Sequence, residues 1–302
     1  MTTLVFGANG QVGHELLRAL APLGVVQGTT RAGTLADGGR CLQADFADAD
    51  AVVALLDAVK PVRVVNAAAY TAVDKAESEP EAALVANATT PGAIARWCAA
   101  HDVPLVHYST DYVFDGQGTR PYRPDDATAP LGVYGTSKLA GEDAIRAAGG
   151  RHLILRTAWV YAAHGHNFLR TMLRVGAEHD VLRVVGDQVG TPTPAALIAD
   201  VTARMLQGDY PRSGTWHLTA EGQTSWHGFA EAIFAGAHAR GLIDRVPTVE
   251  AITTADYPTP AKRPGYSRLD TSTLVSDFGV ALPDWRDALG DVLDTLAETR
   301  AP

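Results

Sequence analysis

The sequence has few cysteines and an excess of negative charge. Its 302 residues include only two cysteines, Cys41 and Cys98. They are too few for the disulfide framework of a small secreted domain and suit a reducing compartment. Lysine and arginine number 25 against 34 aspartate and glutamate residues, so the net charge is −9. Because nucleic-acid-binding domains are usually basic, this balance argues against nucleic acid as a partner.

Long apolar runs are also missing. The run Ala51–Leu56 is far shorter than the roughly 20 residues that cross a bilayer. Residues Met1–Phe6 contain no basic residue and their apolar stretch stops at Gly7, which is unlike a secretory signal peptide. Hydrophobic residues still make up 46 % of the chain, enough for a packed core. We therefore expect a folded cytoplasmic protein with no membrane partner.

Short strand-like runs alternate with longer helical segments along the first half of the chain. The strand-like runs are Leu4–Phe6, Val25–Val26, Val62–Val65, Pro104–Tyr108 and His152–Leu155. The helical segments include Ala51–Val59, Glu79–Ala100 with an interruption near Pro91, and Tyr134–Ala148. This alternation predicts an α/β fold of the Rossmann type, with a doubly wound parallel sheet. In the less regular second half, the proline-rich stretch Val246–Leu269 is expected to be a loop.

A glycine-rich turn follows the first predicted strand. Gly7, Gly10 and Gly13 are spaced G-x-x-G-x-x-G and lead directly into a helical pattern. Glycine allows a tight turn and lets the backbone approach a pyrophosphate, which the free N–H groups of the helix start then face. Three glycines among 29 also fit an ordinary strand-to-helix turn. The position between strand and helix favours a dinucleotide site.

The ends of the next strands carry further cofactor candidates. The second strand ends near Thr30 and Arg31 without the acidic residue that binds a ribose 2′-hydroxyl in NAD sites. Arg31 either pairs with a 2′-phosphate, which favours NADPH over NADH, or is a solvated surface side chain. Asp45 and Phe46 either hold the adenine or begin a helix. The small residues Ala67–Ala69 let a cofactor lie against the third strand.

A Ser-Thr pair and a Tyr-x-x-x-Lys motif form the candidate catalytic set. Tyr134 and Lys138 are four residues apart, so on a helix they share a face and converge on one ligand. Ser109 and Thr110 end the preceding strand, where a hydroxyl would bind the same substrate oxygen. An ammonium near a phenol lowers the phenol's pKa from about 10, which makes Tyr134 a usable proton donor. We therefore predict that Tyr134, Lys138 and Thr110 are catalytic.

With further segments, these motifs resemble the extended short-chain dehydrogenase/reductase superfamily and, within it, the dTDP-4-dehydrorhamnose reductases. The resemblance covers nearly the whole chain in order. The segments that carry it are Gly7–Gly13, Val65–Glu77, His107–Phe114, Ala129–Glu142, Arg156–Tyr161, Gly186–Thr193 and Pro260–Pro264.

The resemblance implies specific binding residues. For NADPH or NADH, it implies Gly7, Gly10, Gln11, Val12, Gly13, Thr30, Arg31, Asp45, Phe46, Ala67, Ala68, Ala69, Tyr70, Thr71, Tyr108, Tyr134 and Lys138. For a dTDP-sugar substrate, it implies Thr110, Asp111, Trp159, Asn167, Gln188 and Arg263. Trp216, Trp226 and Trp285 are instead expected to be core or interface anchors.

The resemblance also raises the question of a metal. Some members of the family are described as bridging a dimer with Mg²⁺ through glutamates. Glu15 stands at one such position, but Ala196 stands where the second glutamate is expected. Because Mg²⁺ prefers carboxylate oxygens, the Mg²⁺ site is doubtful, and either a monomer or a homodimer is expected. His164 and His166 lack an obvious acidic or cysteine co-ligand nearby and indicate a polar loop.

The implied function is reduction of the C4 keto group of dTDP-4-dehydro-L-rhamnose with NAD(P)H, as the last step of dTDP-L-rhamnose synthesis for cell-surface polysaccharide. Sugar-nucleotide dehydratases of this superfamily carry an acidic pair after the threonine, whereas here Tyr112 follows Asp111, which leaves simple reduction. The alternatives are another sugar-nucleotide reductase or epimerase, and a non-catalytic nucleotide-binding regulatory subunit. Residues 1–160, joined by part of 180–225, are expected to bind NAD(P). Residues 161–302 are expected mainly to form a smaller α/β region that binds the sugar nucleotide.

Overall fold

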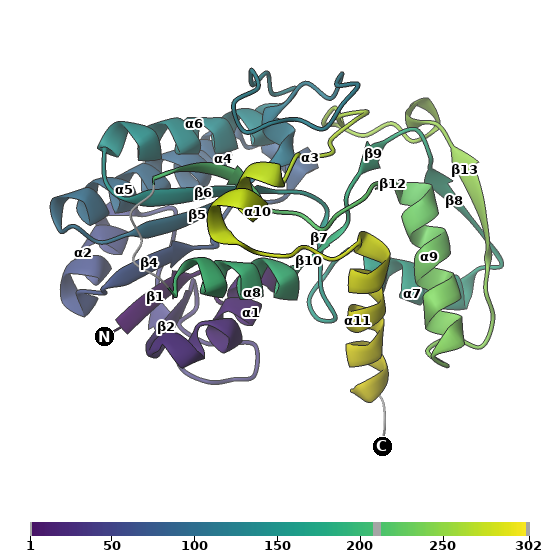
Figure 1. Cartoon of the computed structure of the whole chain (residues 1–302), viewed down its shortest axis with the longest axis horizontal. Coiled ribbons are helices and arrows are strands. Elements are labelled where there is room, and N and C mark those ends of the chain that lie inside the picture. Colours follow the sequence, from purple (N-terminus) through teal and green to yellow (C-terminus); the bar gives the residue numbers. More distant parts are fainter. Residues whose placement is uncertain (1, 208–212, 300–302) are drawn as a thin grey trace.

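The computed structural model describes residues 2–207 and 213–299. Its centre is a seven-stranded parallel sheet with the strand order β11-β6-β5-β4-β1-β2-β3 (Figure 1). The strands are β1 (Thr2–Phe6), β2 (Val25–Thr30), β3 (Leu42–Gln43), β4 (Arg63–Asn66), β5 (Leu105–Thr110), β6 (His152–Thr157) and β11 (Gly214–His217). The order 3-2-1-4-5-6 within this sheet is that of a Rossmann fold, so the predicted fold class is confirmed.

Helices cover both faces of the sheet. One face packs on α1 (Gln11–Ala19), α8 (Ala195–Met205) and α10 (Ser272–Phe278), which contribute Leu16, Ile198 and Leu274 to the core. The other face packs on α2 (Ala49–Val59), α5 (Thr90–Ala100) and α6 (Val133–Ala148). Short elements complete this part: η1 (Ala21–Leu23), α3 (Val73–Ala76), α4 (Pro80–Leu84), η2 (Val85–Thr89) and η3 (Asp111–Val113). Because β11, α8 and α10 come late in the chain, the sheet is completed by the second half.

A smaller region lies beside the sheet, with its helices at the right of Figure 1. Its elements are β7 (Val160–Tyr161), α7 (Phe168–Glu178), β8 (Val181–Val185), β9 (Val189–Gly190), β10 (Thr193–Pro194), β12 (Thr224–Ser225), α9 (Trp226–Ala239), β13 (Thr248–Ile252), η4 (Thr254–Asp256) and α11 (Trp285–Glu298). Leu169, Phe229, Ile233, Trp285 and Leu289 form its core.

One sequence expectation about local structure was wrong. The stretch Val246–Leu269 is not all loop, because β13 pairs in parallel with β8 along its whole length. The interruption expected near Pro91 in the helix Glu79–Ala100 is confirmed: the π-helical turn η2 lies just before it, and Pro91 lies in the first turn of α5. Within residues 2–207 and 213–299, no helix is long and apolar enough to cross a bilayer.

Candidate active site

A cavity of about 870 Å³ opens where β1, β2, β4, β5 and β6 end. Parallel strands place their carboxyl ends at one edge, which is where ligands of such sheets bind. The predicted residues that line this cavity are Gly7, Gly10, Gln11, Val12, Thr30, Arg31, Phe46, Ala67, Ala68, Ala69, Tyr70, Thr71, Tyr108, Thr110, Asp111, Tyr134, Lys138, Trp159 and Asn167. The predicted residues that do not line it are Gly13, Asp45, Gln188 and Arg263.

The three glycines of the turn have different roles. Gly7 has φ +83°, a backbone conformation that favours glycine. Gly13 faces away from the cavity, because a Cβ there would overlap the carbonyl oxygen of Gly7, so its role is close packing. Gly10 faces the cavity and is the N-cap of α1, with no side chain capping the helix. The first N–H groups of α1 are therefore available to an anion, as a dinucleotide pyrophosphate requires.

The end of β2 presents one cation to the cavity. Arg31 lines the cavity with its side chain 82 % exposed, and its Nε lies 3.5 Å from Oδ1 of Asp45. The same Asp45 oxygen accepts a hydrogen bond from the N–H of Ala47, so Asp45 starts a turn and does not reach the cavity. The hydroxyl of Thr30 bonds the backbone of Thr34 and thereby shapes the turn after β2. Phe46 is buried edge-on against Phe6.

Tyr134 and Lys138 meet Thr110 and Asp111 in the same cavity. Tyr134 and Lys138 lie on α6, whereas Thr110 ends β5 and Asp111 follows it. The phenol of Tyr134 is partly exposed in the cavity, and burial in the surrounding walls still raises its pKa to about 12; Thr110 beside it opposes the rise only in part. The phenol is therefore protonated at neutral pH.

The expected lowering of the Tyr134 pKa by Lys138 was wrong. The Nζ atom of Lys138 donates to the carbonyl oxygen of Tyr108 at 2.6 Å and lies 3.4 Å from Nε2 of His107. Burial lowers the pKa of Lys138 itself to about 8, and the nearby Glu142 carboxylate opposes that change. The ammonium is thus held against β5, and burial is the largest influence on the Tyr134 pKa.

His107 is a buried neighbour of Lys138 that sequence reasoning missed. It is fully buried on β5, and the amide nitrogen of Asn66 donates to its Nδ1 at 3.0 Å. Burial and the neighbouring Lys138 ammonium hold the pKa of His107 well below its usual value, so the imidazole is neutral. His107 is two residues before Ser109 on the same strand, and period-2 alternation was the available signal.

Two unpaired acceptors mark the polar end of the cavity. One oxygen of Asp111 accepts from Thr110 at 2.9 Å, while Oδ2 has no well-aligned hydrogen-bond partner in the described parts of the chain. Burial raises the pKa of Asp111 to about 6, and the hydroxyls of Ser267 and Thr110 offset this only in part. Thr157 pairs in register with Thr110, and its Oγ1 is also buried without a partner. Thr157 was not predicted, although it ends the strand beside Thr110.

Three substrate candidates make protein contacts of their own. Gln188 donates to Oγ1 of Thr254 at 3.0 Å, and Arg263 forms an ion pair with Asp74 at 2.7 Å. Neither lines the cavity, and their role in binding the substrate stays a prediction. Asn167 does line the cavity, but its amide caps α7 and donates to Gln11 and to two carbonyl oxygens. Tyr108 lines the cavity while its hydroxyl bonds Thr202 on α8.

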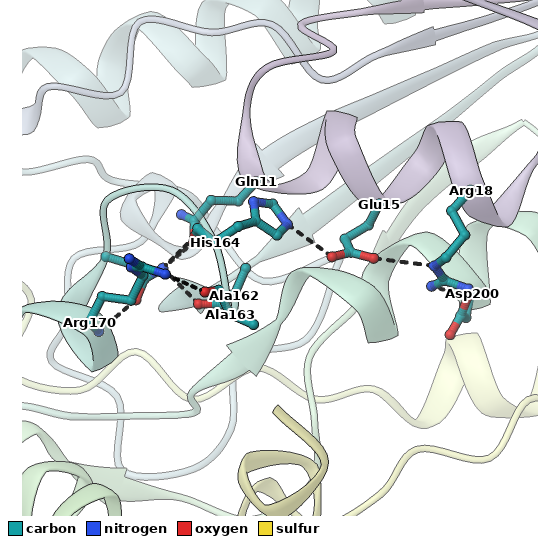
Figure 2. A network of polar contacts seen from close by, with 9 residues as sticks. Gln11, Glu15, Arg18, Ala162, Ala163, His164, Arg170 and Asp200 are labelled. Atoms are coloured by element: carbon teal, nitrogen blue, oxygen red, sulfur yellow. Dashed lines mark hydrogen bonds and ion pairs between the residues drawn. The ribbon is translucent and has the colours of Figure 1, made fainter. Parts of the chain in front are cut away.

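Glu15 belongs to a chain of polar contacts between α1 and the loop before α7. Figure 2 shows its carboxylate between His164 and Arg18. Nε2 of His164 lies 2.9 Å from one carboxylate oxygen of Glu15, and Nε of Arg18 lies 3.3 Å from the other. A second nitrogen of Arg18 forms an ion pair with Asp200 at 2.9 Å. No group of three or more metal-binding side chains occurs within residues 2–207 and 213–299. The Glu15 carboxylate is thus engaged by His164 and Arg18.

Known proteins resemble this chain over its whole length. A family model described as the RmlD substrate binding domain matches residues 1–298. The dTDP-4-dehydrorhamnose reductase of Escherichia coli K12 is 45 % identical, with 100 % of both chains covered. The structure of such a reductase from Clostridium acetobutylicum is 37 % identical, with a TM-score of 0.88, and covers 98 % of this chain and 99 % of its own. The Bacillus anthracis enzyme in complex with NADP is 30 % identical, with a TM-score of 0.87 and coverages of 97 % and 99 %.

Proposed function

The chain belongs to the family of dTDP-4-dehydrorhamnose reductases, and from this premise we propose that it reduces the C4 keto group of dTDP-4-dehydro-L-rhamnose. It is an oxidoreductase with a nicotinamide cofactor, and the product is dTDP-L-rhamnose. The observation that carries the proposal is one cavity that holds both an uncapped helix N-terminus and the set Thr110, Tyr134 and Lys138. In this set a protonated phenol, a buried ammonium and a hydroxyl surround a single space.

The cofactor binds along the glycine turn in this proposal. Gly10 and the first N–H groups of α1 hold the pyrophosphate, and Phe46 lies beside the adenine. Arg31, which reaches the cavity from the end of β2, pairs with a 2′-phosphate and favours NADPH over NADH. When bound, the nicotinamide supplies the hydride that reduces the C4 carbon. The Glu15 carboxylate is engaged by His164 and Arg18, so the proposed reaction uses no Mg²⁺ there.

Tyr134 donates the proton that completes the reduction. Its raised pKa keeps the phenol protonated at neutral pH, which is the state a reductase needs before the reaction. As charge develops on the C4 oxygen, the phenol O–H transfers its proton to that oxygen, and the ammonium of Lys138 stabilises the phenolate left behind. The hydroxyl of Thr110, which donates to Asp111 in the free protein, turns to donate to the same oxygen and holds it in place. Hydride on carbon and proton on oxygen together convert the ketone to an alcohol.

The remaining cavity groups hold the sugar. Oδ2 of Asp111 and Oγ1 of Thr157 are buried without a well-aligned partner in the described residues, and a sugar hydroxyl would satisfy both. An unsatisfied buried polar atom costs about 1–3 kcal/mol, so pairing with substrate recovers that free energy on binding. Trp159 adds an aromatic wall beside them.

The test measures NADPH oxidation with authentic keto-sugar nucleotide. Tyr134→Phe should lower kcat by a factor of about 10² or more, the usual contribution of a general acid, with the Kd of NADPH unchanged. Tyr161→Phe is the matched control, since this buried phenol lies outside the cavity and its hydroxyl has no partner in the described residues. Net cofactor consumption separates a reductase from an epimerase. Failure of the wild type to oxidise either NADPH or NADH would contradict the proposal.

A further inference from the structure

A second indole covers the tryptophan that lines the cavity. The rings of Trp159 and Trp226 are stacked, with centroids 3.6 Å apart and planes 7° from parallel. Trp226 is the first residue of α9 and is not part of the cavity lining. Its ring also contacts Phe168 on α7, at a centroid distance of 4.8 Å. Trp159 thus faces the cavity, and Trp226 links its ring to the helices of the smaller region.

Trp159 has an unfavourable backbone conformation. Its φ is +48°, a left-handed conformation that residues with a side chain rarely adopt. Such a conformation persists only where surrounding contacts determine it. The N–H of Thr193 donates to the Trp159 carbonyl oxygen at 3.2 Å, which holds the peptide, while the ring is held by its stacking partner. The orientation of this indole therefore depends on its neighbours.

Gly190 provides the space that the ring occupies. A Cβ at Gly190 would lie 2.5 Å from Cε2 and 2.7 Å from Nε1 of Trp159. Gly190 belongs to β9, which pairs with β12, and β12 leads directly into Trp226. The short β9–β12 ladder therefore positions both Gly190, which leaves space for the ring, and Trp226, which stacks on it. Sequence analysis assigned Trp226 to packing alone, whereas its main partner is a cavity residue.

We propose that Trp226 is a positioning residue for the reductase reaction. It fixes the plane of the Trp159 indole so that this ring forms a wall for the apolar face of the deoxysugar, and Gly190 leaves room for that placement. Trp226 itself touches neither substrate nor cofactor. The inference rests on the proposed function, because it assigns the Trp159 side of the cavity to the sugar nucleotide.

The kinetic test compares variants at two residues that contact the Trp159 ring. Trp226→Leu removes the stacking partner and should raise the KM of the sugar nucleotide about tenfold, in line with the loss of one aromatic pair. Trp226→Phe keeps an aromatic ring and should restore the KM to within about threefold. Gly190→Ala places a Cβ against Cε2 and Nε1 of Trp159 and should also raise this KM, which provides a second perturbation. In all three variants the Kd of NADPH should stay at the wild-type value.

Circular dichroism tests the stack without activity. Two stacked indoles give an exciton couplet, which should disappear in Trp226→Leu and Trp226→Phe. Trp216→Phe is the matched control: it removes an indole that packs against Phe278 outside the cavity lining, and it should keep the couplet. If the wild type is active but Trp226→Leu and Gly190→Ala leave the KM of the sugar nucleotide unchanged, the inference is overturned and the proposed function is not. The same holds if the Kd of NADPH rises as much as that KM. A wild type without turnover overturns the proposed function and the inference with it.

Discussion

The pH dependence of the reaction should be bell-shaped, with limbs set by Lys138 and Asp111. Lys138 is only 2 % exposed, and burial takes its pKa from 10.5 to about 8. At about 1.4 kcal/mol for each pKa unit, the ammonium form is disfavoured by about 3 kcal/mol relative to water. Because this side chain must be charged to stabilise the Tyr134 phenolate, activity should fall as pH rises through about 8.

The acid limb follows from Asp111. Burial takes its pKa from 3.8 to about 6, so the carboxylate that accepts a sugar hydroxyl forms only above that pH. Below about 6 the group is protonated and its acceptor role is reduced. Tyr134 has a pKa of about 12 and stays protonated across the whole range, so it contributes no limb between pH 5 and 10. The plateau should therefore lie between about pH 6 and 8.

The assay is the initial rate of NADPH oxidation from pH 5 to 10, expressed as kcat/KM, which reports the pKa values of the free enzyme. Lys138→Arg should remove the limb near pH 8 even if the rate is low, because arginine keeps its charge throughout. Asp111→Asn should remove the limb near pH 6 and leave the other. A basic limb that survives unchanged in Lys138→Arg would refute the assignment and point to another group.

The other predictions concern stability, cofactor choice and metal. Glu142 and Arg156 are buried and joined by two hydrogen bonds of 2.8 and 2.7 Å. Glu142→Ala should therefore lower the free energy of unfolding, measured by urea denaturation, by about 3–5 kcal/mol. Asp143→Ala, at the exposed neighbour, should lower it by under about 1 kcal/mol, and equal losses would contradict this. Arg31→Ala should raise the KM of NADPH roughly tenfold and leave that of NADH unchanged, as expected for one lost charged contact to a phosphate. Dialysis against EDTA should leave kcat unchanged, and a loss restored by Mg²⁺ would show that Glu15 is free to bind metal.

The parts of the site that sequence analysis found are those encoded over short distances. The glycine turn and the Tyr134–Lys138 pair each lie within a few residues of chain, so local geometry alone brings their groups together. Thr157 and His107 were missed because their roles depend on which strands are neighbours. The contacts of Arg263 and Gln188 could not be predicted for a similar reason: Asp74, 189 residues away from Arg263, pairs with its guanidinium, and Thr254 accepts from the Gln188 amide.

The direction of a pKa shift is harder to predict than the identity of the group. Spacing correctly put Lys138 near Tyr134, and Coulomb attraction alone then predicts a more acidic phenol. The fold buries both groups, and desolvation acts on them in opposite directions: it raises the pKa of Tyr134 and lowers that of Lys138. Burial is a property of the assembled cavity, so a motif read along the chain does not contain it.

The net charge of −9 also has to be reconciled with two anionic ligands. Local potential decides this, because surface charges are screened beyond about 10 Å at moderate ionic strength. Arg31 and Lys138 line the cavity, and the open start of α1 adds a partial positive charge, whereas Arg263 is neutralised by Asp74 and adds little. The single buried carboxylate in the lining, Asp111, has its pKa raised to about 6 by its surroundings, which weakens the opposing charge close to the substrate. An acidic chain therefore binds a dinucleotide and a sugar nucleotide by concentrating its few available cations at one edge of the sheet, and added salt should weaken cofactor binding more in the wild type than in Arg31→Ala.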